Sequence, residues 1–305
     1  MSSDLRYLIV LLGPTGVGKT DLSVTLSYQF NAPILSADSR QFYREMRIGT
    51  AAPSEKILST TPHYFVGNKS IVDRYSCGIF ELEVLKLLDN LFKIHQTSML
   101  VGGSGLYIDS VCNGIDDFPA PDAELRKELY TQLQLEGIEG LRNQLKLLDP
   151  EYYNRVDLKN TQRILKAIEV CLQTGRSFSS FRTQPKKPRP FIPIKIGLNR
   201  SREELYQRIN DRVDGMIADG LVAEAKGLYN QKHLNALNTV GYKEIFDYLD
   251  GITNLEVAID LIKRNSRRYA KRQLTWWARD KEITWFHPDQ VDIIIEFIKN
   301  KMQNG

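Results

Sequence analysis

A glycine-rich segment near the N-terminus carries residue types that bind phosphate. It reads Gly13-Pro14-Thr15-Gly16-Val17-Gly18-Lys19-Thr20, which is the spacing G-x-x-x-x-G-K-[ST]. The glycines of this pattern let the backbone wrap around a phosphate group with its N–H groups pointing inward. Lys19 adds a cation, and the Thr20 hydroxyl can ligate Mg²⁺. This phosphate loop predicts a phosphate site, but it does not say which molecule carries the phosphate.

A carboxylate is expected beside the phosphate loop. The short apolar run 33–37 leads into Asp38, and the run 98–101 leads into a second glycine-rich turn at 102–107. In an open α/β sheet, ligands bind just outside the carboxyl ends of the strands. If 33–37 is a parallel strand, Asp38 therefore lies in the same crevice as the phosphate loop. A typical ATP-hydrolysing protein would end the run 98–101 in a carboxylate for Mg²⁺, and its absence argues against a plain ATPase.

A basic stretch near the C-terminus suggests nucleic acid. Residues 263–279 contain no acidic residue; their cations are Lys263, Arg264, Arg267, Arg268, Lys271, Arg272 and Arg279, interleaved with Tyr269, Trp276 and Trp277. Cations neutralise phosphates, and aromatic rings stack on unpaired bases. The alternative is an amphipathic helix whose tryptophans belong to the core. A second basic patch is predicted at Lys186, Lys187 and Arg189.

The elements that must position these residues alternate between strands and helices. The run Tyr7–Leu12 has the unbroken apolar pattern of a buried parallel strand, and further strands are expected at 33–37, 98–101 and 191–198. Expected helices are 19–30, 78–96, 122–136, 138–147, 161–174, 201–220, one from about 242, 255–279 and a short one after 291. This order predicts an α/β fold: a P-loop-type parallel sheet with flanking helices and an inserted helical module. The core is assigned to 1–114 and 191–305, and the insert to 115–190.

One of these helices carries two candidate anion ligands. Ser201-Arg202-Glu203-Glu204 has the pattern of a capping box, which would start the helix 201–220. Arg208 and Arg212 lie one turn apart within it. The pair fits either a functional site or a solvated charged face.

Composition limits the class of protein. The 305 residues are 42% hydrophobic and 26% charged, with a formal net charge of +4, which is typical of a soluble globular protein. There is no apolar stretch of the ~18 residues that a membrane span needs, and no signal-peptide pattern. The three cysteines form no disulfide or zinc pattern, and the four histidines are scattered. A cytoplasmic protein is expected.

The order of motifs resembles one known family. GPTGVGKT, SADSRQFYREMRIGTAAPS, VGGSGLY, NTVGYKE and AKRQLTWWARD follow one another as in the tRNA dimethylallyltransferases, the MiaA-type isopentenyl transferases, and the similarity spans about residues 6–286. The resemblance implies transfer of a dimethylallyl group from dimethylallyl diphosphate to N6 of adenosine 37, beside the tRNA anticodon, in tRNAs that read codons beginning with U. Diphosphate would leave, and Mg²⁺ would be the cofactor.

The resemblance also implies roles for residues. Asp38 would be the base that takes the N6 proton. Gly13 to Thr20 would bind the diphosphate, with Lys19 and Thr20 catalytic and Thr20 on the metal. Arg208 or Arg212 would clamp the diphosphate, with Arg208 preferred. Contacts to the tRNA anticodon stem-loop would come from Asp38, Ser39, Arg40, Gln41, Ser104, Arg126, Gln162, Arg163, Ile164, Leu165, Lys166, the segment 238–243 with Gly241, Tyr242 and Lys243, and the segment 271–278 with Lys271, Arg272, Gln273 and Trp276. The family usually has Thr at position 104, and the hydroxyl is kept here.

Two other functions remain open at this point. An ATP-dependent kinase of a nucleotide or small metabolite would share the phosphate loop, the parallel sheet and a helical insert. A non-catalytic RNA-binding NTPase module would leave Asp38 without a role. A monomer is expected for any of the three.

Overall fold

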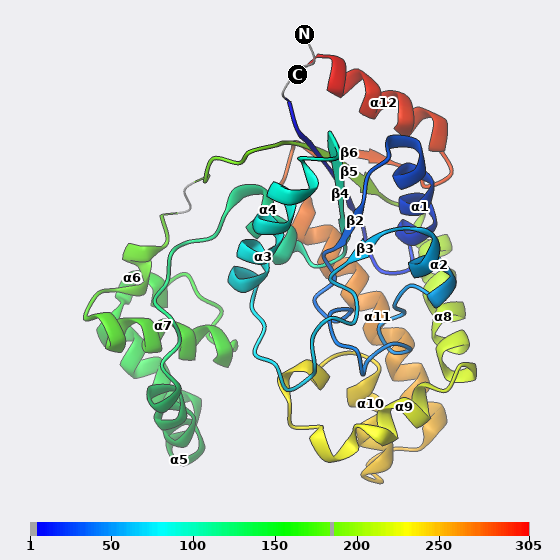
Figure 1. The fold of residues 1–305 in the computed structure, drawn as a ribbon. Helices are drawn as coiled ribbons and strands as arrows, with labels where there is room; N and C mark the ends of the chain where they lie inside the picture. Colours follow the sequence, from blue (N-terminus) through cyan, green and yellow to red (C-terminus); the bar gives the residue numbers. More distant parts are fainter. Residues whose placement is uncertain (1–4, 184–185, 305) are drawn as a thin grey trace. The chain divides into compact units, whose positions relative to one another are not determined.

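The computed structural model describes residues 5–183 and 186–304, and within them six parallel strands form one sheet in the order β3-β2-β4-β1-β5-β6 (Figure 1). The strands are β1 (Tyr7–Leu12), β2 (Ile34–Ser36), β3 (His63–Tyr64), β4 (Thr97–Gly102), β5 (Ile192–Leu198) and β6 (Thr284–Phe286). The expected fold class, a P-loop-type α/β sheet, is thus confirmed.

β1 lies in the middle of the sheet beside β4, and all six of its residues are buried. It pairs with β4 on one side and with β5 on the other, and Leu12 lies opposite both Gly102 and Gly197. The three strands therefore end at the same level. As a result, the phosphate loop after β1, the glycine turn after β4 and residues 199–201 after β5 all leave the sheet at one edge, as the crevice rule for parallel sheets requires.

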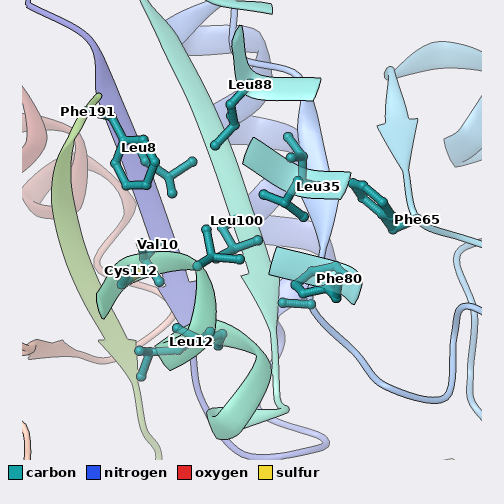
Figure 2. Packing of buried hydrophobic residues seen from close by; sticks show 14 of the residues in the cluster. Leu8, Val10, Leu12, Leu35, Phe65, Phe80, Leu88, Leu100, Cys112 and Phe191 are labelled. Carbon is teal, nitrogen blue, oxygen red and sulfur yellow. The ribbon is translucent and has the colours of Figure 1, made fainter. Parts of the chain in front are cut away.

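Helices cover both faces of the sheet. The first face packs Leu8, Val10 and Leu12 against α3 (Cys77–Leu91) and α4 (Gly105–Asn113), with Phe80 in the same cluster (Figure 2). The second face packs the alternate residues of β1 against α1 (Lys19–Phe30), α8 (Arg202–Ala218) and α12 (Val291–Gln303). This two-sided burial explains the unbroken apolar run of β1.

A further apolar cluster forms beside the sheet, where α8 packs with α9 (Leu221–Gly227), α10 (Tyr242–Leu249) and α11 (Leu255–Trp277). The remaining short elements of this part are α2 (Glu55–Thr60) and the 3-10 turns η2 (Tyr229–Gln231) and η3 (Asn235–Leu237).

Some expected boundaries were wrong. The helix expected at 78–96 ends at Leu91, with Phe92 as its C-cap. The helix expected at 201–220 ends at Ala218, and Gly220 in the left-handed region begins α9. The strands β3 and β6 were not expected, because runs of two and three residues carry too little periodicity to stand out.

The chain divides into two compact units, residues 1–112 with 188–305, and residues 113–187. The second unit consists of α5 (Ala123–Leu148), α6 (Pro150–Tyr153), α7 (Thr161–Thr174) and the 3-10 turn η1 (Phe178–Phe181) around its own apolar cluster. Gly137 (φ 71°, ψ −171°) interrupts α5, at the residue between the two helices expected at 122–136 and 138–147.

Throughout the described ranges, every helix is too short or too polar to pass through a bilayer.

Candidate active site

The phosphate loop is held by backbone geometry and by its own lysine. Gly18, the N-cap of α1, has φ 109°, a region that favours glycine. α1 begins at Lys19, so the positive end of the helix dipole lies at the loop. The Lys19 ammonium donates to the carbonyls of Gly13 at 2.8 Å and Pro14 at 2.9 Å. The lysine therefore crosses the loop instead of pointing into solvent.

Three ionisable groups influence one another at this loop. Burial lowers the pKa of Lys19 to about 7; the Asp38 carboxylate opposes this shift, and the Arg212 guanidinium adds to it. Burial also lowers the pKa of Arg212, again against the effect of Asp38. Asp38 thus lies near enough to both cations to stabilise their charges, which places the carboxylate beside the phosphate loop as expected.

Arg208 and Arg212 both contact the phosphate loop from α8. Arg208 is exposed, and its Nε donates to the Gly16 carbonyl at 3.0 Å. Arg212 is partly buried, and it donates to the Thr15 hydroxyl at 3.3 Å and to the Thr50 carbonyl at 3.4 Å. Neither arginine is part of a merely solvated face. Their acceptors are neutral, so both guanidinium charges stay available to an anion.

A cavity of about 1130 Å³ unites these groups. Its walls include Lys19 and Thr20 from the phosphate loop, Asp38 after β2, and Arg208 and Arg212 from α8. Other residues from the sequence expectations that line it are Thr15, Gly16, Gly18, Ser39, Arg40, Gln41, Asn238, Gly241, Lys243, Arg272 and Gln273. The volume is slightly above the range of about 300–1,000 Å³ that is usual for small-molecule pockets.

Asp38 is fixed by the turn that follows it. Its Oδ1 accepts the backbone N–H of Arg40 at 3.0 Å. The Ser104 hydroxyl accepts the Ser39 N–H at 2.9 Å and donates to the Ser39 hydroxyl at 3.1 Å. Tyr269 of α11 hydrogen-bonds to Ser104, and burial together with nearby Asp38 raises the pKa of Tyr269 to about 12. Ser104 thereby ties the end of β4 to the turn that carries Asp38.

Several side chains expected at the tRNA interface are already engaged within the protein. Gln273 is buried; its Oε1 accepts the Thr15 N–H at 2.9 Å, and its Nε2 donates to the Gly103 carbonyl at 2.8 Å. Tyr242 is fully buried, and its hydroxyl donates a hydrogen bond to the Glu224 carboxylate at 2.6 Å. Gln41 donates to the carbonyls of Thr50 and Ala51. These hydrogen bonds hold the three side chains in place within the protein, and their contact with tRNA stays a prediction.

The outer face of α11 is basic. Arg264, Arg268, Lys271 and Arg272 are exposed at helical spacing, and Arg279 is exposed just after the helix ends at Trp277. In the part of the chain that the structure describes, no carboxylate lies within 4 Å of Arg264, Arg268, Lys271 or Arg272, whereas Arg279 pairs with Asp109 at 2.5 Å. Arg268 and Arg272 line both the large cavity and a second hollow of about 510 Å³, which also includes Lys271 and Trp276.

The two tryptophans of α11 differ. Trp277 is buried in the core, as the alternative interpretation held. Trp276 is partly buried, and its indole N–H donates to Asp109 at 3.0 Å.

The prediction of a second basic patch was wrong for Arg189. Arg189 is 8% exposed and pairs with the buried Glu81 at 2.6 Å. Lys187 pairs with Asp117 at 2.6 Å.

In the insert, two of the cations expected to contact tRNA lie around a buried carboxylate. Glu169 is 1% exposed; it pairs with Arg126 at 2.6 Å, and the Lys166 ammonium lies 3.9 Å away. Gln162 and Arg163 are exposed on α7, but Ile164 and Leu165 are buried in the cluster of the insert. The side chains of Ile164 and Leu165 therefore support the helix and do not form part of its outer surface.

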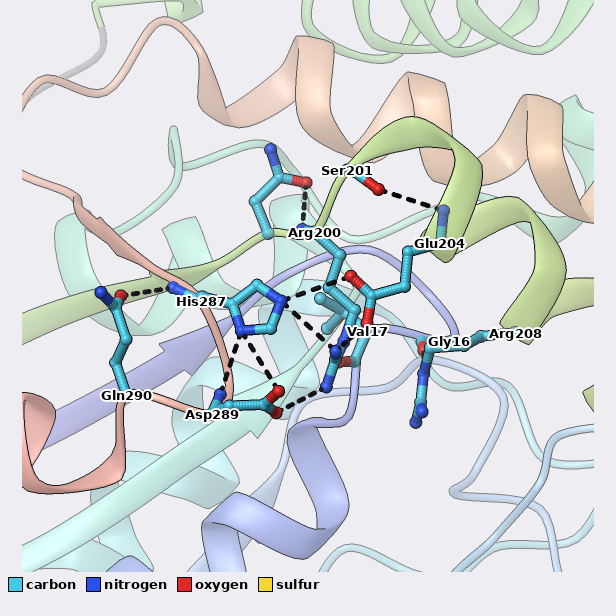
Figure 3. Close-up of polar contacts among 10 residues, drawn as sticks. Gly16, Val17, Arg200, Ser201, Glu204, Arg208, His287, Asp289 and Gln290 are labelled. Atoms are coloured by element: carbon cyan, nitrogen blue, oxygen red, sulfur yellow. Dashed lines mark hydrogen bonds and ion pairs between the residues drawn. The ribbon is translucent and has the colours of Figure 1, made fainter.

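Sequence reasoning missed three residues that shape these sites, Arg200, Glu224 and Glu169, and it missed the structural role of Gln273. Glu224 accepts the backbone N–H groups of Arg47, Ile48 and Gly49 beside the cavity. Local patterns gave little signal for them, because most of their partners are distant in sequence; the exceptions are the pairs Arg200–Glu204 and Lys166–Glu169. The capping box was half right: the Ser201 hydroxyl accepts the Glu204 N–H, but the Glu204 side chain turns to Arg200 and His287 (Figure 3).

The chain is similar to known proteins along most of its length. A family model described as IPP transferase matches residues 41–280. The chain is 53% identical to a tRNA dimethylallyltransferase of Bacteroides fragilis, over 96% of this chain and 98% of that protein. It is similar to the crystal structure of a tRNA isopentenylpyrophosphate transferase from Bacillus halodurans, with a TM-score of 0.73, 35% identity and coverage of 98% and 97%.

A third match is a structure of a eukaryotic dimethylallyltransferase acting on tRNA, with a TM-score of 0.82 and 26% identity, covering 97% of this chain and 80% of that one. Since the family model matches well over half of the chain and the relative from Bacteroides is similar along nearly all of it, the chain belongs to the family of tRNA dimethylallyltransferases, which are prenyltransferases.

Proposed function

We propose that this enzyme transfers a dimethylallyl group from dimethylallyl diphosphate to N6 of adenosine 37 in tRNAs that read codons beginning with U. The observation that carries the proposal is the single cavity that unites the phosphate loop with Asp38 and is bordered by basic residues of α11. Such a cavity suits a small diphosphate at one end and a nucleotide of a larger polymer at the other.

The phosphate loop binds and stabilises the leaving diphosphate. As the bond between C1 of the dimethylallyl group and the diphosphate oxygen breaks, its electron pair stays with the diphosphate. Backbone N–H groups of the loop and the Lys19 ammonium meet this growing negative charge, which is the form of electrostatic stabilisation that lowers such barriers most. Among the described residues the Lys19 ammonium donates to two neutral carbonyls and has no carboxylate within 4 Å, so it can turn to the diphosphate without breaking an ion pair.

Asp38 acts as the general base. The N6 amine forms a bond to the allylic carbon, and its proton passes to the Asp38 carboxylate. Arg40 N–H and the Ser39–Ser104 contacts fix the backbone that carries this carboxylate. A positioned base of this kind contributes about 10²–10⁴-fold to a rate.

Mg²⁺ fits the donor set of the cavity. Among the described residues no cluster of three or more His, Cys, Asp or Glu side chains could hold a metal alone. Mg²⁺ is typically bound by few protein oxygens together with substrate phosphates and water, and the Thr20 hydroxyl lines the cavity. Thr20 would hold the ion, which would neutralise diphosphate charge when bound.

Arg212 is the better candidate for the diphosphate clamp. Its guanidinium lies close enough to Asp38 for that carboxylate to affect the pKa of Arg212, and close enough to Lys19 to affect the pKa of the lysine. Arg208, in contrast, is exposed and donates to the Gly16 carbonyl. We assign Arg212 to the diphosphate and Arg208 to the shape of the loop.

The tRNA anticodon stem-loop is proposed to lie along the exposed cations of α11, with Arg126, Gln162, Arg163 and Lys166 of the insert as further contacts. Adenosine 37 must leave its stack to reach Asp38, as bases do in other base-modifying enzymes. Ser39, Arg40 and Lys243 line the cavity in which it would arrive. We further propose a cytoplasmic location, in line with the three free cysteines, and a monomer.

The deciding experiment incubates the protein, Mg²⁺ and unmodified tRNA with labelled dimethylallyl diphosphate, beside a tube with γ-labelled ATP. Label is expected in tRNA, with ATP left intact, and a tRNA with guanosine at position 37 is the matched control. ATP consumption without allyl transfer would instead support the kinase alternative.

A further inference from the structure

Arg200 contacts the phosphate loop from the outside. It lies between the end of β5 and Ser201, the N-cap of α8, and its Nε donates to the Val17 carbonyl at 2.9 Å (Figure 3). Its side chain is 8% exposed. The contact joins the loop after β1 to the loop after β5, which are neighbours because the two strands pair in register.

The rest of the Arg200 guanidinium is occupied by a second set of partners. Nη1 pairs with Glu204 and lies 3.4 Å from His287 Nε2, and Nη2 pairs with Asp289 at 3.1 Å. His287 in turn lies 3.3 Å from Glu204. Two carboxylates therefore balance the charge of Arg200, in contrast to Arg208 and Arg212, whose acceptors are neutral. Because these carboxylates offset its charge, Arg200 is suited to hold the Val17 carbonyl in place and not to bind an anion.

Holding the Val17 carbonyl determines where the next N–H points. In a trans peptide the C=O and the following N–H point in opposite directions. With the Val17 oxygen fixed on the side of Arg200, the N–H of Gly18 is turned to the other side, and Gly18 lines the large cavity. Gly18 itself imposes little restraint, because glycine at φ 109° has wide conformational freedom.

We propose that Arg200 is a positioning residue that orients the Gly18 N–H toward the leaving diphosphate. The inference rests on the proposed diphosphate site. Glu204, His287 and Asp289 hold the guanidinium in the plane that this contact needs. The β6–α12 loop, which carries His287 and Asp289, thereby supports a donor that belongs to the phosphate loop.

The test compares Arg200→Lys and Arg200→Gln with the wild type in steady-state transfer assays. Lysine keeps the charge but cannot supply the planar fork that reaches Val17, Glu204 and Asp289 together. Both variants are expected to lower kcat/KM for dimethylallyl diphosphate by about ten- to a hundredfold, since loss of one preorganised donor costs up to about 10³-fold. KM for tRNA is expected to stay within about twofold. Arg202→Gln, at an exposed neighbour that lies over the Tyr206 ring, is the matched control.

Hydrogen exchange supplies a readout that activity does not. On addition of inorganic diphosphate and Mg²⁺, the backbone amides of residues 15–20 are expected to gain protection in the wild type and less in both variants. Asp289→Asn retains Arg200 and is expected to cost only about two- to threefold in kcat/KM; it keeps the proposal testable if Arg200→Gln does not fold. Full activity of Arg200→Lys, or equal losses for both substrates, would overturn the inference. A wild type that transfers no allyl group would overturn the proposed function instead.

Discussion

The phosphate loop and the insert both rely on arginines, but they hold them in opposite ways. Arg208 and Arg212 donate to a carbonyl and a hydroxyl, so their charges are not cancelled. Arg126 of the insert pairs with Glu169, a carboxylate that is almost fully buried. Neutral acceptors leave a cation available to attract an anion, whereas a buried carboxylate fixes the direction of the cation and offsets its positive charge with a negative one. The first arrangement suits chemistry on a diphosphate, and the second suits orientation of a contact. The expected effects of substitutions in the two regions differ accordingly.

The largest effect is expected at Asp38. Asp38→Ala should lower kcat by about 10²–10⁴-fold, because the general base acts in the chemical step. The dissociation constant for tRNA should change little, because the basic face of α11 and the insert are untouched. Single-turnover transfer and a filter-binding assay measure the two quantities separately. Equal losses in binding and turnover would remove Asp38 from the role of base.

The pH dependence of dimethylallyl diphosphate binding should report the protonation of Lys19 in the phosphate loop. Since burial lowers the pKa of Lys19 to about 7, the lysine is largely neutral at pH 8 and must take up a proton to meet a diphosphate. Affinity for dimethylallyl diphosphate should therefore fall by up to about tenfold per pH unit above pH 7. Calorimetry in buffers of different ionisation enthalpy should detect nearly one proton taken up at pH 8.

The same shift has a consequence of opposite sign for stability. Between about pH 7 and the ordinary lysine value of 10.5, the unfolded chain binds more protons at position 19 than the folded chain does. The contribution of Lys19 to the free energy of unfolding therefore rises with pH in this window. If calorimetry detects no proton uptake at pH 8 when dimethylallyl diphosphate binds, the Lys19 amine is already protonated in the free protein, and both expectations are wrong.

A smaller effect is expected on the outer face of α11. Lys271→Ala combined with Arg272→Ala should weaken tRNA binding by about tenfold at low salt and reduce the slope of log K against log salt by up to about 2. Lys263→Ala is a suitable control, because Lys263 already pairs with Asp214 at 2.6 Å. An unchanged salt slope in the double variant would exclude these two residues from the interface.

The smallest effect tests the insert. Glu169→Gln should weaken tRNA binding by only about threefold, since it removes the orientation of Arg126 but not its charge. Arg126→Gln with Glu169→Gln should then be no weaker than Arg126→Gln alone. KM for dimethylallyl diphosphate should not change in any of them. Glu151→Gln, which breaks the exposed Glu151–Arg155 pair of the same unit, is the matched control. A loss of donor affinity in Glu169→Gln would contradict the contrast between the two regions.

Local sequence patterns predicted what local physics determines. The strand, loop and helix around Lys19 follow from an apolar run, glycine freedom and helix spacing, and each was identified. The position of Asp38 followed from the rule for strand ends. The contacts of Arg200 with Val17 and Asp289, of Glu169 with Arg126 and of Gln273 with Thr15 and Gly103 could not be predicted, because they depend on which distant elements pack together. For the same reason Arg189 was misread: its charge suggested a surface, while Glu81 holds it in the interior.

The paired hydrogen bonds of Gln273 constrain how α11 can change over evolutionary time. Substitutions on the outer face of the helix alter which cations it displays, and they leave Thr15 and Gly103 in contact with Gln273. Insertion or deletion of one residue earlier in α11 would rotate Gln273 by about 100° about the helix axis. Such a change would break the link to the phosphate loop even if every basic residue were kept. The composition of α11 is therefore adjustable, whereas its residue count up to position 273 is not.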